Sequence, residues 1–113
     1  MNEEERILRF LGLARRAGFV ESGYDAVVTS VKLKTAKMII MATDISRNTL
    51  DKLLSMAETT EEPMPEIYRF STMDSLGNAI GKPPRALVAI TDDGFTNKLK
   101  TMLEGFDKRE EHD

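Results

Sequence analysis

The residues best suited to bind a ligand are basic and polar side chains around the predicted start of one helix. Ser22 has the side chain of a helix N-cap, and Asp25 three residues later completes a capping box. The backbone N–H groups of residues 23–25 are then expected to be free for an anion. Because Arg15 and Arg16 come shortly before this turn, the pattern predicts a surface for phosphate groups. The candidate contacts are Arg15, Arg16, Ser22, Gly23, Tyr24, Asp25, Lys82 and Arg85.

Two of these side chains could read a nucleotide base. The ring of Tyr24 offers a face on which an unstacked base could lie, and the carboxylate of Asp25 could accept hydrogen bonds from a guanine edge. Each also has an ordinary structural interpretation: Tyr24 as an exposed neighbour of the cap, and Asp25 as the partner in its own capping box. Arg15 and Arg16 could equally stabilise the C-terminal end of their own helix. On the residues alone, RNA is one ligand class among several.

The chain offers few groups for catalysis or for metal binding. It has no cysteine, and its single histidine, His112, lies in a charged C-terminal segment. The adjacent carboxylates Asp92 and Asp93 follow an apolar run and precede an amphipathic one, which indicates helix capping rather than a metal site. The sequence contains no glycine motif of the Walker or dinucleotide-binding type. We therefore expect a protein that is not an enzyme and that needs no cofactor or metal.

The charged residues are unevenly distributed along the chain, whose 113 residues have a net charge of −3. Residues 6–37 contain seven Lys or Arg and two acidic residues, whereas residues 104–113 contain five acidic and two basic residues. A basic face is therefore compatible with the negative net charge. We expect one domain over residues 1–113, with residues 104–113 as an acidic tail. Without a long apolar run or a signal-like N-terminus, the composition predicts a cytoplasmic protein.

Helical and strand patterns alternate along the chain, which predicts a three-layer α/β/α sandwich. The segment 71–94 shows this most clearly. Ser71 and Asp74 are expected to open a short helix, Gly81 to end it in a left-handed conformation, and residues 86–90 to form a strand buried on both faces. The other predicted helices lie at 4–17, 22–33, 50–57 and 95–106, and the other predicted strands at 19–20, 37–42 and 66–70.

Two stretches combine glycines, basic residues and apolar runs in a characteristic order. They read LGLARRAGFVESG from residue 11 and LGNAIGKPPRALVAITDDGF from residue 76. Both resemble the kink-turn RNA-binding family of ribosomal proteins that includes the L7Ae and L30e types, and are similar to its bacterial YlxQ-like branch. The likeness covers roughly residues 5–103. It implies a small, mixed, four-stranded sheet and a non-catalytic protein that binds ribosomal or other structured RNA, with ribosomal or translation-associated proteins as further partners.

In that family, the N-terminus of the second helix enters the widened groove of a kinked RNA, where an Asn-Glu pair reads tandem sheared G·A base pairs. Tyr24 and Asp25 occupy the positions of this pair. Asp25 keeps the carboxylate on a shorter side chain, but a tyrosine lacks the paired donor and acceptor of an amide. Val28 replaces a common Lys, and Lys-Pro-Pro at 82–84 replaces a loop with an apolar contact such as Ile-Glu-Val. The alternative to an RNA-binding protein is a protein-interaction module that keeps the fold but has lost the RNA site. A third possibility, against the expectation of a non-enzyme, is a small-molecule enzyme on an α/β scaffold.

Overall fold

The computed structural model describes the backbone of residues 1–111 and the side chains of residues 1–107. The helices and strands within this range are α1 (Glu3–Arg16), β1 (Val20–Ser22), α2 (Tyr24–Lys32), β2 (Met38–Met41), α3 (Arg47–Thr59), β3 (Glu66–Arg69), α4 (Met73–Ala79), β4 (Leu87–Ile90) and α5 (Asp93–Glu111). The strands form one sheet in the order β1-β4-β2-β3. β2 and β3 are parallel, whereas β4 is antiparallel to both β1 and β2, so the sheet is mixed.

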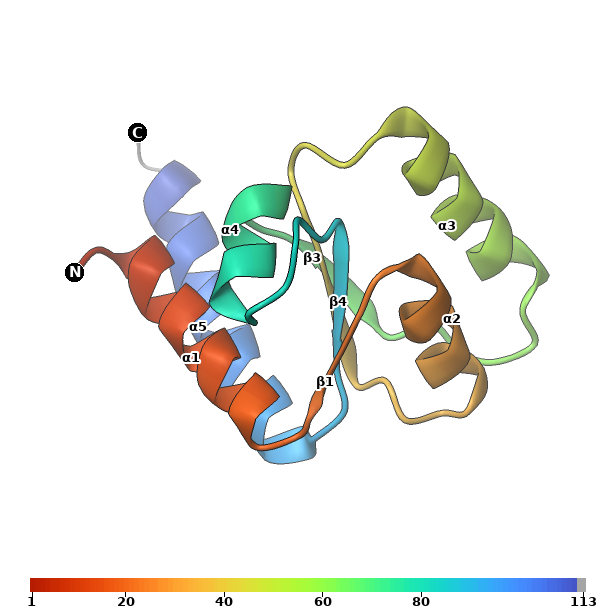
Figure 1. Cartoon of the computed structure of the whole chain (residues 1–113), viewed down its shortest axis with the longest axis horizontal. Helices are drawn as coiled ribbons and strands as arrows, with labels where there is room; N and C mark the ends of the chain where they lie inside the picture. The colour runs from red at the N-terminus through yellow and green to blue at the C-terminus, as the bar shows by residue number, and fades with distance from the viewer. Residues whose placement is uncertain (112–113) are drawn as a thin grey trace.

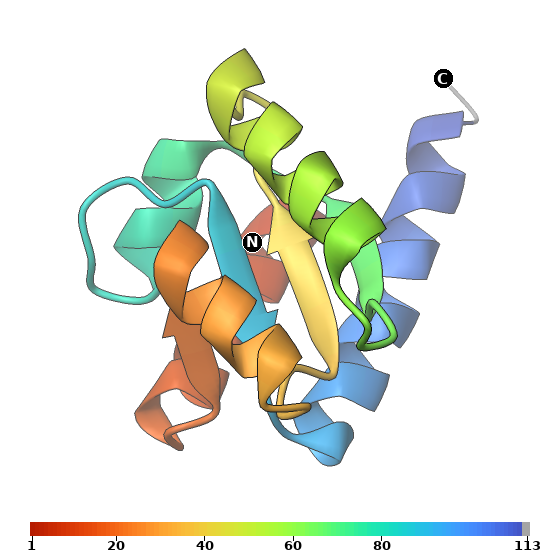
Figure 2. The same ribbon diagram turned by 90° about the vertical axis from the view of Figure 1, so that its right-hand side faces the viewer.

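Helices cover both faces of this sheet, which confirms the predicted three-layer α/β/α sandwich. In Figure 1 the sheet is seen from its edge, with α1, α4 and α5 on one side and α2 and α3 on the other. Figure 2 views the molecule from the side of α2 and α3, which lie across the strands. The loop between α4 and β4 runs beside the N-terminal end of α2 in this view. Two segments far apart in sequence therefore meet at one end of the sandwich.

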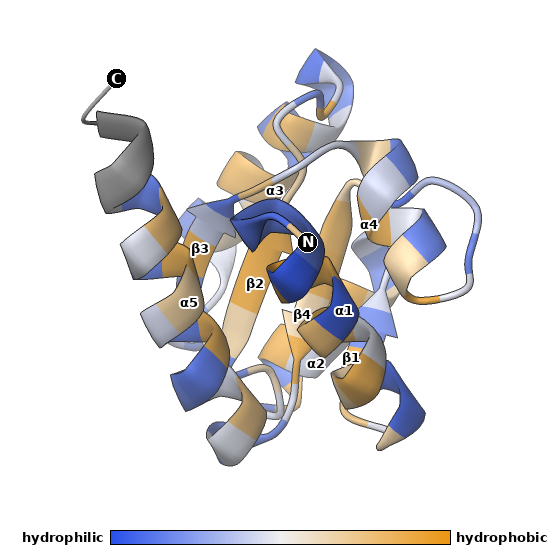
Figure 3. Ribbon diagram, turned by 90° about the vertical axis from the view of Figure 1, so that its left-hand side faces the viewer, coloured by the Kyte–Doolittle hydropathy of each residue, from blue (hydrophilic) through white to orange (hydrophobic). Residues whose placement is uncertain are grey.

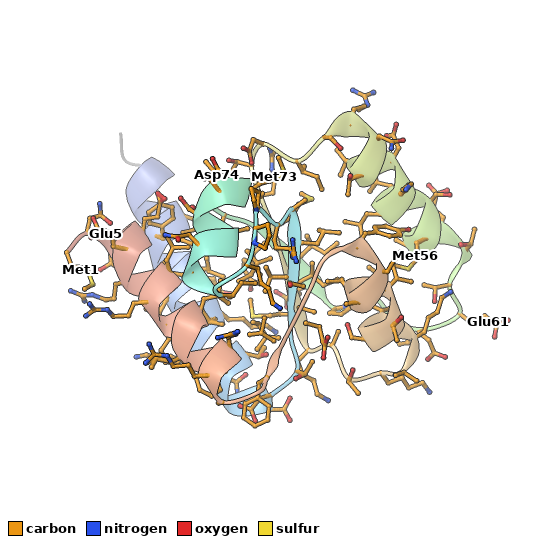
Figure 4. All side chains as sticks on the ribbon, in the orientation of Figure 1. Met1, Glu5, Met56, Glu61, Met73 and Asp74 are labelled. Atoms are coloured by element: carbon orange, nitrogen blue, oxygen red, sulfur yellow. The ribbon has the colours of Figure 1, made fainter. Side chains whose placement is uncertain are left out.

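Burial on both faces explains the continuous apolar runs of the two central strands. In β4, Val88 and Ile90 pack with the core of α1, α4 and α5, whereas Leu87 and Ala89 pack with that of α2 and α3. All four residues of β2 and of β4 are buried, as the sequence predicted for these strands. Figure 3 shows hydrophobic residues along the sheet, and Figure 4 shows side chains filling the space on both sides of it.

The residues that precede α2 and α4 differ from the predicted N-caps. Ser22 is not the N-cap of α2: it is the last residue of β1, which extends beyond the predicted strand at 19–20. Gly23 instead precedes α2, with a φ of +92° and no side-chain cap. Ser71 is not the N-cap of α4 either, because it adopts a left-handed φ of +61°. The hydroxyl of Thr72 takes that role and accepts a hydrogen bond from the N–H of Ser75 (3.1 Å).

The last helix is longer than the prediction. Its predicted cap is confirmed, since Oδ2 of Asp92 accepts a hydrogen bond from the N–H of Phe95 (2.9 Å). Residues 104–111, which the prediction described as part of an acidic tail, continue α5. An apolar face on α5, with Leu99 and Leu103 buried in the core, explains why the helix persists through this charged sequence. His112 lies outside the described residues.

Gly81 follows α4 in the left-handed conformation that the sequence predicted, with a φ of +70°. A Cβ here would meet only the guanidinium group of Arg15, at 3.7–3.8 Å. We therefore expect Gly81→Ala to lower the free energy of unfolding by about 1 kcal/mol, through backbone strain rather than a clash. Urea unfolding measures this cost. Gly81→Asn should cost less, because asparagine tolerates this conformation better, and an alanine variant as stable as the parent would contradict the explanation.

Candidate nucleic-acid interface

The turn between β1 and α2 leaves the first helical N–H groups without hydrogen-bond partners in the described part of the chain. The N–H of Gly23 is not among them, contrary to the prediction, because it donates to the carbonyl of Leu87 (3.0 Å). The carbonyl of Gly23 accepts from the N–H of Val27 (3.0 Å), which is the first hydrogen bond of the helix. With no side-chain cap, the N–H groups of residues 24–26 remain available for an anion, at the positive end of the helix dipole.

Asp25 and Tyr24 follow this turn in different environments. The side chain of Asp25 is exposed, and no capping bond to its own helix holds it, so the predicted capping box is wrong. Tyr24 is half-buried, and its hydroxyl donates to the carbonyl of Lys52 on α3 (3.1 Å). The ammonium group of Lys52 lies 5.6 Å from the centre of the Tyr24 ring. This cation–π contact gives Tyr24 a structural role that ties α2 to α3.

Arg85 connects the loop before β4 to the end of β1. Its Nε donates to the hydroxyl of Ser22 (3.2 Å), and its Nη1 donates to the carbonyls of Pro83 and Pro84 (3.5 and 3.3 Å). The hydroxyl of Ser22 thus accepts a hydrogen bond from Arg85 instead of capping α2. These bonds fix the loop beside the turn that precedes α2, as the sequence predicted for Lys82 and Arg85. Arg85 is held in place by them, whereas Lys82 is exposed and makes no side-chain hydrogen bond or ion pair among the described residues.

The same loop lies directly on α4, at a position where only glycine fits. A Cβ at Gly77 would come within 2.2 Å of the carbonyl oxygen of Pro83 and 2.9 Å of that of Lys82. The loop is also bonded to the helix through its backbone: Lys82 donates to the carbonyl of Gly77 (2.9 Å), and Arg85 donates to that of Met73 (3.0 Å). The close approach at Gly77 therefore sets the position of the loop and of its basic residues.

The structure separates the two neighbouring arginines of α1. Arg15 lies over Gly81, since a Cβ at Gly81 would be 3.7 Å from its Cζ atom. Its charge is thus close to the C-terminal end of α4, where a cation is favourable, and also close to Lys82. Arg16 instead borders a groove between α1 and α4, together with Ser75. Of the predicted contacts, Arg85 contacts Ser22 at the turn before α2, and Arg15 lies over Gly81, the neighbour of Lys82 in sequence. Arg16 lies apart from them in the groove between α1 and α4.

Two groups of acidic residues lie in other parts of the molecule, one after α3 and one on β3 and α5. Glu61 and Glu62 follow α3, and Figure 4 places Glu61 at the end of the molecule remote from α1. On β3, the hydroxyl of Tyr68 lies 2.7 Å from Oε2 of Glu66 and 3.2 Å from that of Glu104. Burial, reinforced by these carboxylates, raises the pKa of Tyr68 far above its ordinary value. The hydrogen bond from Tyr68, with help from Lys100, lowers the pKa of Glu66. This cluster ties β3 to α5.

The described residues include neither a group of metal ligands nor a helix fit to span a membrane. No three His, Cys, Asp or Glu side chains in that part of the chain are grouped so that they could hold a metal ion. None of the helices in the same range is both long enough and apolar enough to cross a membrane.

The sequence and the fold match one class of protein. Residues 5–100 match the Ribosomal protein L7Ae/L30e/S12e/Gadd45 family, and the chain belongs to it. The chain is 37% identical to RNA-binding protein YlxQ of Bacillus subtilis (strain 168), over 83% of this chain and 91% of that protein. It is 32% identical to RNA-binding protein YlxQ of Enterococcus faecium, over 93% of this chain and all of that protein. The resemblance to the YlxQ-like branch is thus confirmed.

Two solved structures share the fold. A protein of unknown function from Bacillus halodurans superposes with a TM-score of 0.75 at 30% identity, covering 87% of this chain and 96% of that one. The 15.5kD RNA binding protein of Giardia lamblia superposes with a TM-score of 0.71 at 15% identity, covering 96% of this chain and 91% of that one. The second likeness concerns the fold alone.

Proposed function

We propose that this chain is a non-catalytic, cytoplasmic RNA-binding protein, one domain in extent, that holds a structured RNA at the N-terminal end of α2. The proposal rests on the polar and charged groups that lie at the N-terminal end of α2. Three backbone N–H groups that have no acceptor among the described residues lie at this end, next to the exposed carboxylate of Asp25. Lys52 lies beside Tyr24, and Arg85 bonds the loop that carries Lys82 to Ser22. Such a surface can bind phosphates through its N–H groups and cations, and a guanine edge through its carboxylate.

The proposed ligand is a kinked RNA with G·A pairs, in ribosomal or another structured RNA. Asp25 stands where the family carries a base-reading carboxylate, and its side chain is not used by the fold. Lys52 adds a cation beside Tyr24 that could contribute to phosphate binding in place of the lysine that Val28 replaces. The names of the two YlxQ relatives, both RNA-binding proteins, support the same ligand class.

One observation favours the alternative, a protein-interaction module without an RNA site. Tyr24 is engaged with Lys52 by its hydroxyl and by its ring, so less of it is open to a base than the sequence suggested. The acidic end near Glu61 and Glu62 would then be the surface for a basic partner. Titration with RNA separates the two proposals, because a module without an RNA site would not bind any RNA at moderate salt.

The test of RNA binding is a titration of a labelled kink-turn RNA at several salt concentrations. We expect a plot of the logarithm of the association constant against the logarithm of the salt concentration to be a falling straight line. Arg15→Ala should reduce the magnitude of its slope by about 0.9, which is the contribution of one phosphate contact. Lys32→Ala removes the same charge at the opposite end of α2 and should leave the slope unchanged. A thermal melt accompanies Arg15→Ala, because Arg15 also lies at the end of α4. An unchanged slope for Arg15→Ala would place the binding surface elsewhere.

A further inference from the structure

The outer side of α1 forms a groove with α4 that the surface at α2 does not include. The groove has a volume of about 580 Å³. Arg9, Leu13 and Arg16 line it from α1, and Ser75 and Asn78 line it from α4. Figure 3 shows this side of the molecule, where α1 lies between α4 and α5. The lining thus combines two guanidinium groups, an amide and a hydroxyl around one exposed leucine.

A close approach of the two helices gives the groove a fixed shape. A Cβ at Gly12 would lie 2.9 Å from the carbonyl oxygen of Ala79, so α1 and α4 are nearly in backbone contact at this point. Beneath the contact, the buried side chains of Leu11 and Leu76 belong to the same core. The walls of the groove are therefore parts of two helices packed on the sheet, and its polar groups project from a rigid base.

The basic groups of the groove are not used by the fold. Neither Arg9 nor Arg16 makes a hydrogen bond or an ion pair among the described residues, whereas Arg6, one turn before Arg9, is paired with Glu3 (3.7 Å). Arg9 and Arg16 are seven residues apart, or about 10 Å along the helix, so each could contact a different phosphate. None of the described residues that line the groove is aromatic, so they offer no platform for stacking a base. Its chemistry fits a sugar–phosphate backbone.

The groove is continuous with the loop that borders α2. Ser75 and Asn78 also line a second hollow, which ends at Lys82 and Pro84. A polyanion that contacts Lys82 could therefore pass over Asn78 into the groove. Asp74, in the first turn of α4, also lines the second hollow. The path from Lys82 to Arg9 thus passes two hydrogen-bonding side chains and two unpaired arginines.

We infer that the groove between α1 and α4 binds the backbone of an RNA stem that extends from the segment held at α2. This inference rests on the proposed function and adds a second, sequence-independent contact to it. Phosphate contacts position an RNA without reading its sequence, so the groove adds affinity that depends on stem length. Arg16 belongs to this second contact rather than to the one at α2.

The test compares three RNAs with the same kinked core: one with two minimal stems, and two in which one or the other stem is extended by about one helical turn. We expect the protein to bind one of the extended RNAs more tightly and with a steeper salt dependence than the short RNA. Arg9→Gln should reduce the slope on that extended RNA by about 0.9 and leave binding of the short RNA unchanged. Arg9→Gln combined with Arg16→Gln should reduce the slope on the extended RNA by about twice as much.

The matched control is Lys32→Gln combined with Lys37→Gln, which removes two exposed charges that do not line the groove and should preserve the gain from the longer stem. Thermal melts establish that all variants are folded. If the parent binds the short RNA but gains nothing from either longer stem, the inference about the groove is wrong and the proposed function stands. The same holds if the gain survives loss of both arginines or if the control abolishes it. If the parent binds none of the RNAs, the proposed function itself is wrong.

Discussion

Gly77→Ala is expected to lower the free energy of unfolding by about 1–3 kcal/mol, although alanine is the better helix former. The added Cβ would lie 2.2 Å from the carbonyl oxygen of Pro83 and 2.7 Å from its carbon, so the backbone of the loop must move. No flexible side chain is available to absorb the clash, since both contacts are with main-chain atoms. Chemical unfolding of the two proteins measures the loss.

The loop also carries Lys82, so the same substitution should weaken binding of RNA even where the protein remains folded. Gly105→Ala is the matched control: Gly105 lies inside α5, and a Cβ there would meet no atom within 4 Å. We expect this control to raise the free energy of unfolding by about 0.5–1 kcal/mol, the usual gain of alanine over glycine in a helix interior. If Gly77→Ala behaves like Gly105→Ala, the loop does not depend on α4 for its position.

The sequence alone was sufficient for the layers of this fold. Apolar periodicity identified the helices, and the uninterrupted runs at residues 37–42 and 86–90 identified the two central strands, because burial on both faces removes the alternation seen in exposed sheets. Helix starts were less predictable. Ser22 and Ser71 both carry side chains suited to a cap, yet strand pairing retains Ser22 in β1, and Ser71 takes a left-handed turn one residue before the true cap. Local chemistry permitted each cap, and tertiary contacts decided against it.

The candidate site was predictable in its location but not in its details. The order of basic residues and turns, with the family resemblance, pointed to the end of α2 and to the loop at 82–85. The contact of Tyr24 with Lys52 links residues 28 positions apart, and no local pattern could indicate it. Gly77 was likewise missed as a site residue, since its importance comes from a loop that folds back onto it. Contacts between segments that are distant in sequence can be identified only in the folded structure.

Asp25→Asn is the substitution expected to affect recognition of a kink-turn most directly. If Asp25 accepts hydrogen bonds from a guanine edge, its loss should cost about 1–3 kcal/mol of discrimination between an RNA with intact G·A pairs and one in which these pairs are Watson–Crick. Affinity for the altered RNA should hardly change, because phosphate contacts do not distinguish the two. Because Asp25 does not cap its helix, we expect Asp25→Asn to change stability only slightly, so an effect on RNA discrimination can be assigned to binding.

Two substitutions are required to test the role of Tyr24, because its ring and its hydroxyl make separate contacts with α3. Tyr24→Phe removes the hydrogen bond to the carbonyl of Lys52 but keeps the ring, whereas Tyr24→Ala removes both. If the ring stacks on a base, Tyr24→Ala should weaken binding of the intact kink-turn by about 1–3 kcal/mol and Tyr24→Phe should retain most of the affinity. If Tyr24 acts only by tying α2 to α3, both variants should lose stability and show equal affinities once the unfolded fraction is taken into account.

Together these substitutions separate base reading from phosphate binding at the end of α2. Loss of discrimination in Asp25→Asn with full binding in Tyr24→Phe would mean that the carboxylate reads the RNA and that the tyrosine positions the helix that presents it. A parent protein that binds intact and altered RNAs equally would instead show that the exposed N–H groups of α2 and the surrounding cations bind phosphate alone. In that case the replacements at Tyr24, Val28 and residues 82–84 explain the loss of kink-turn recognition, because each removes a group that the family uses to contact the kinked RNA.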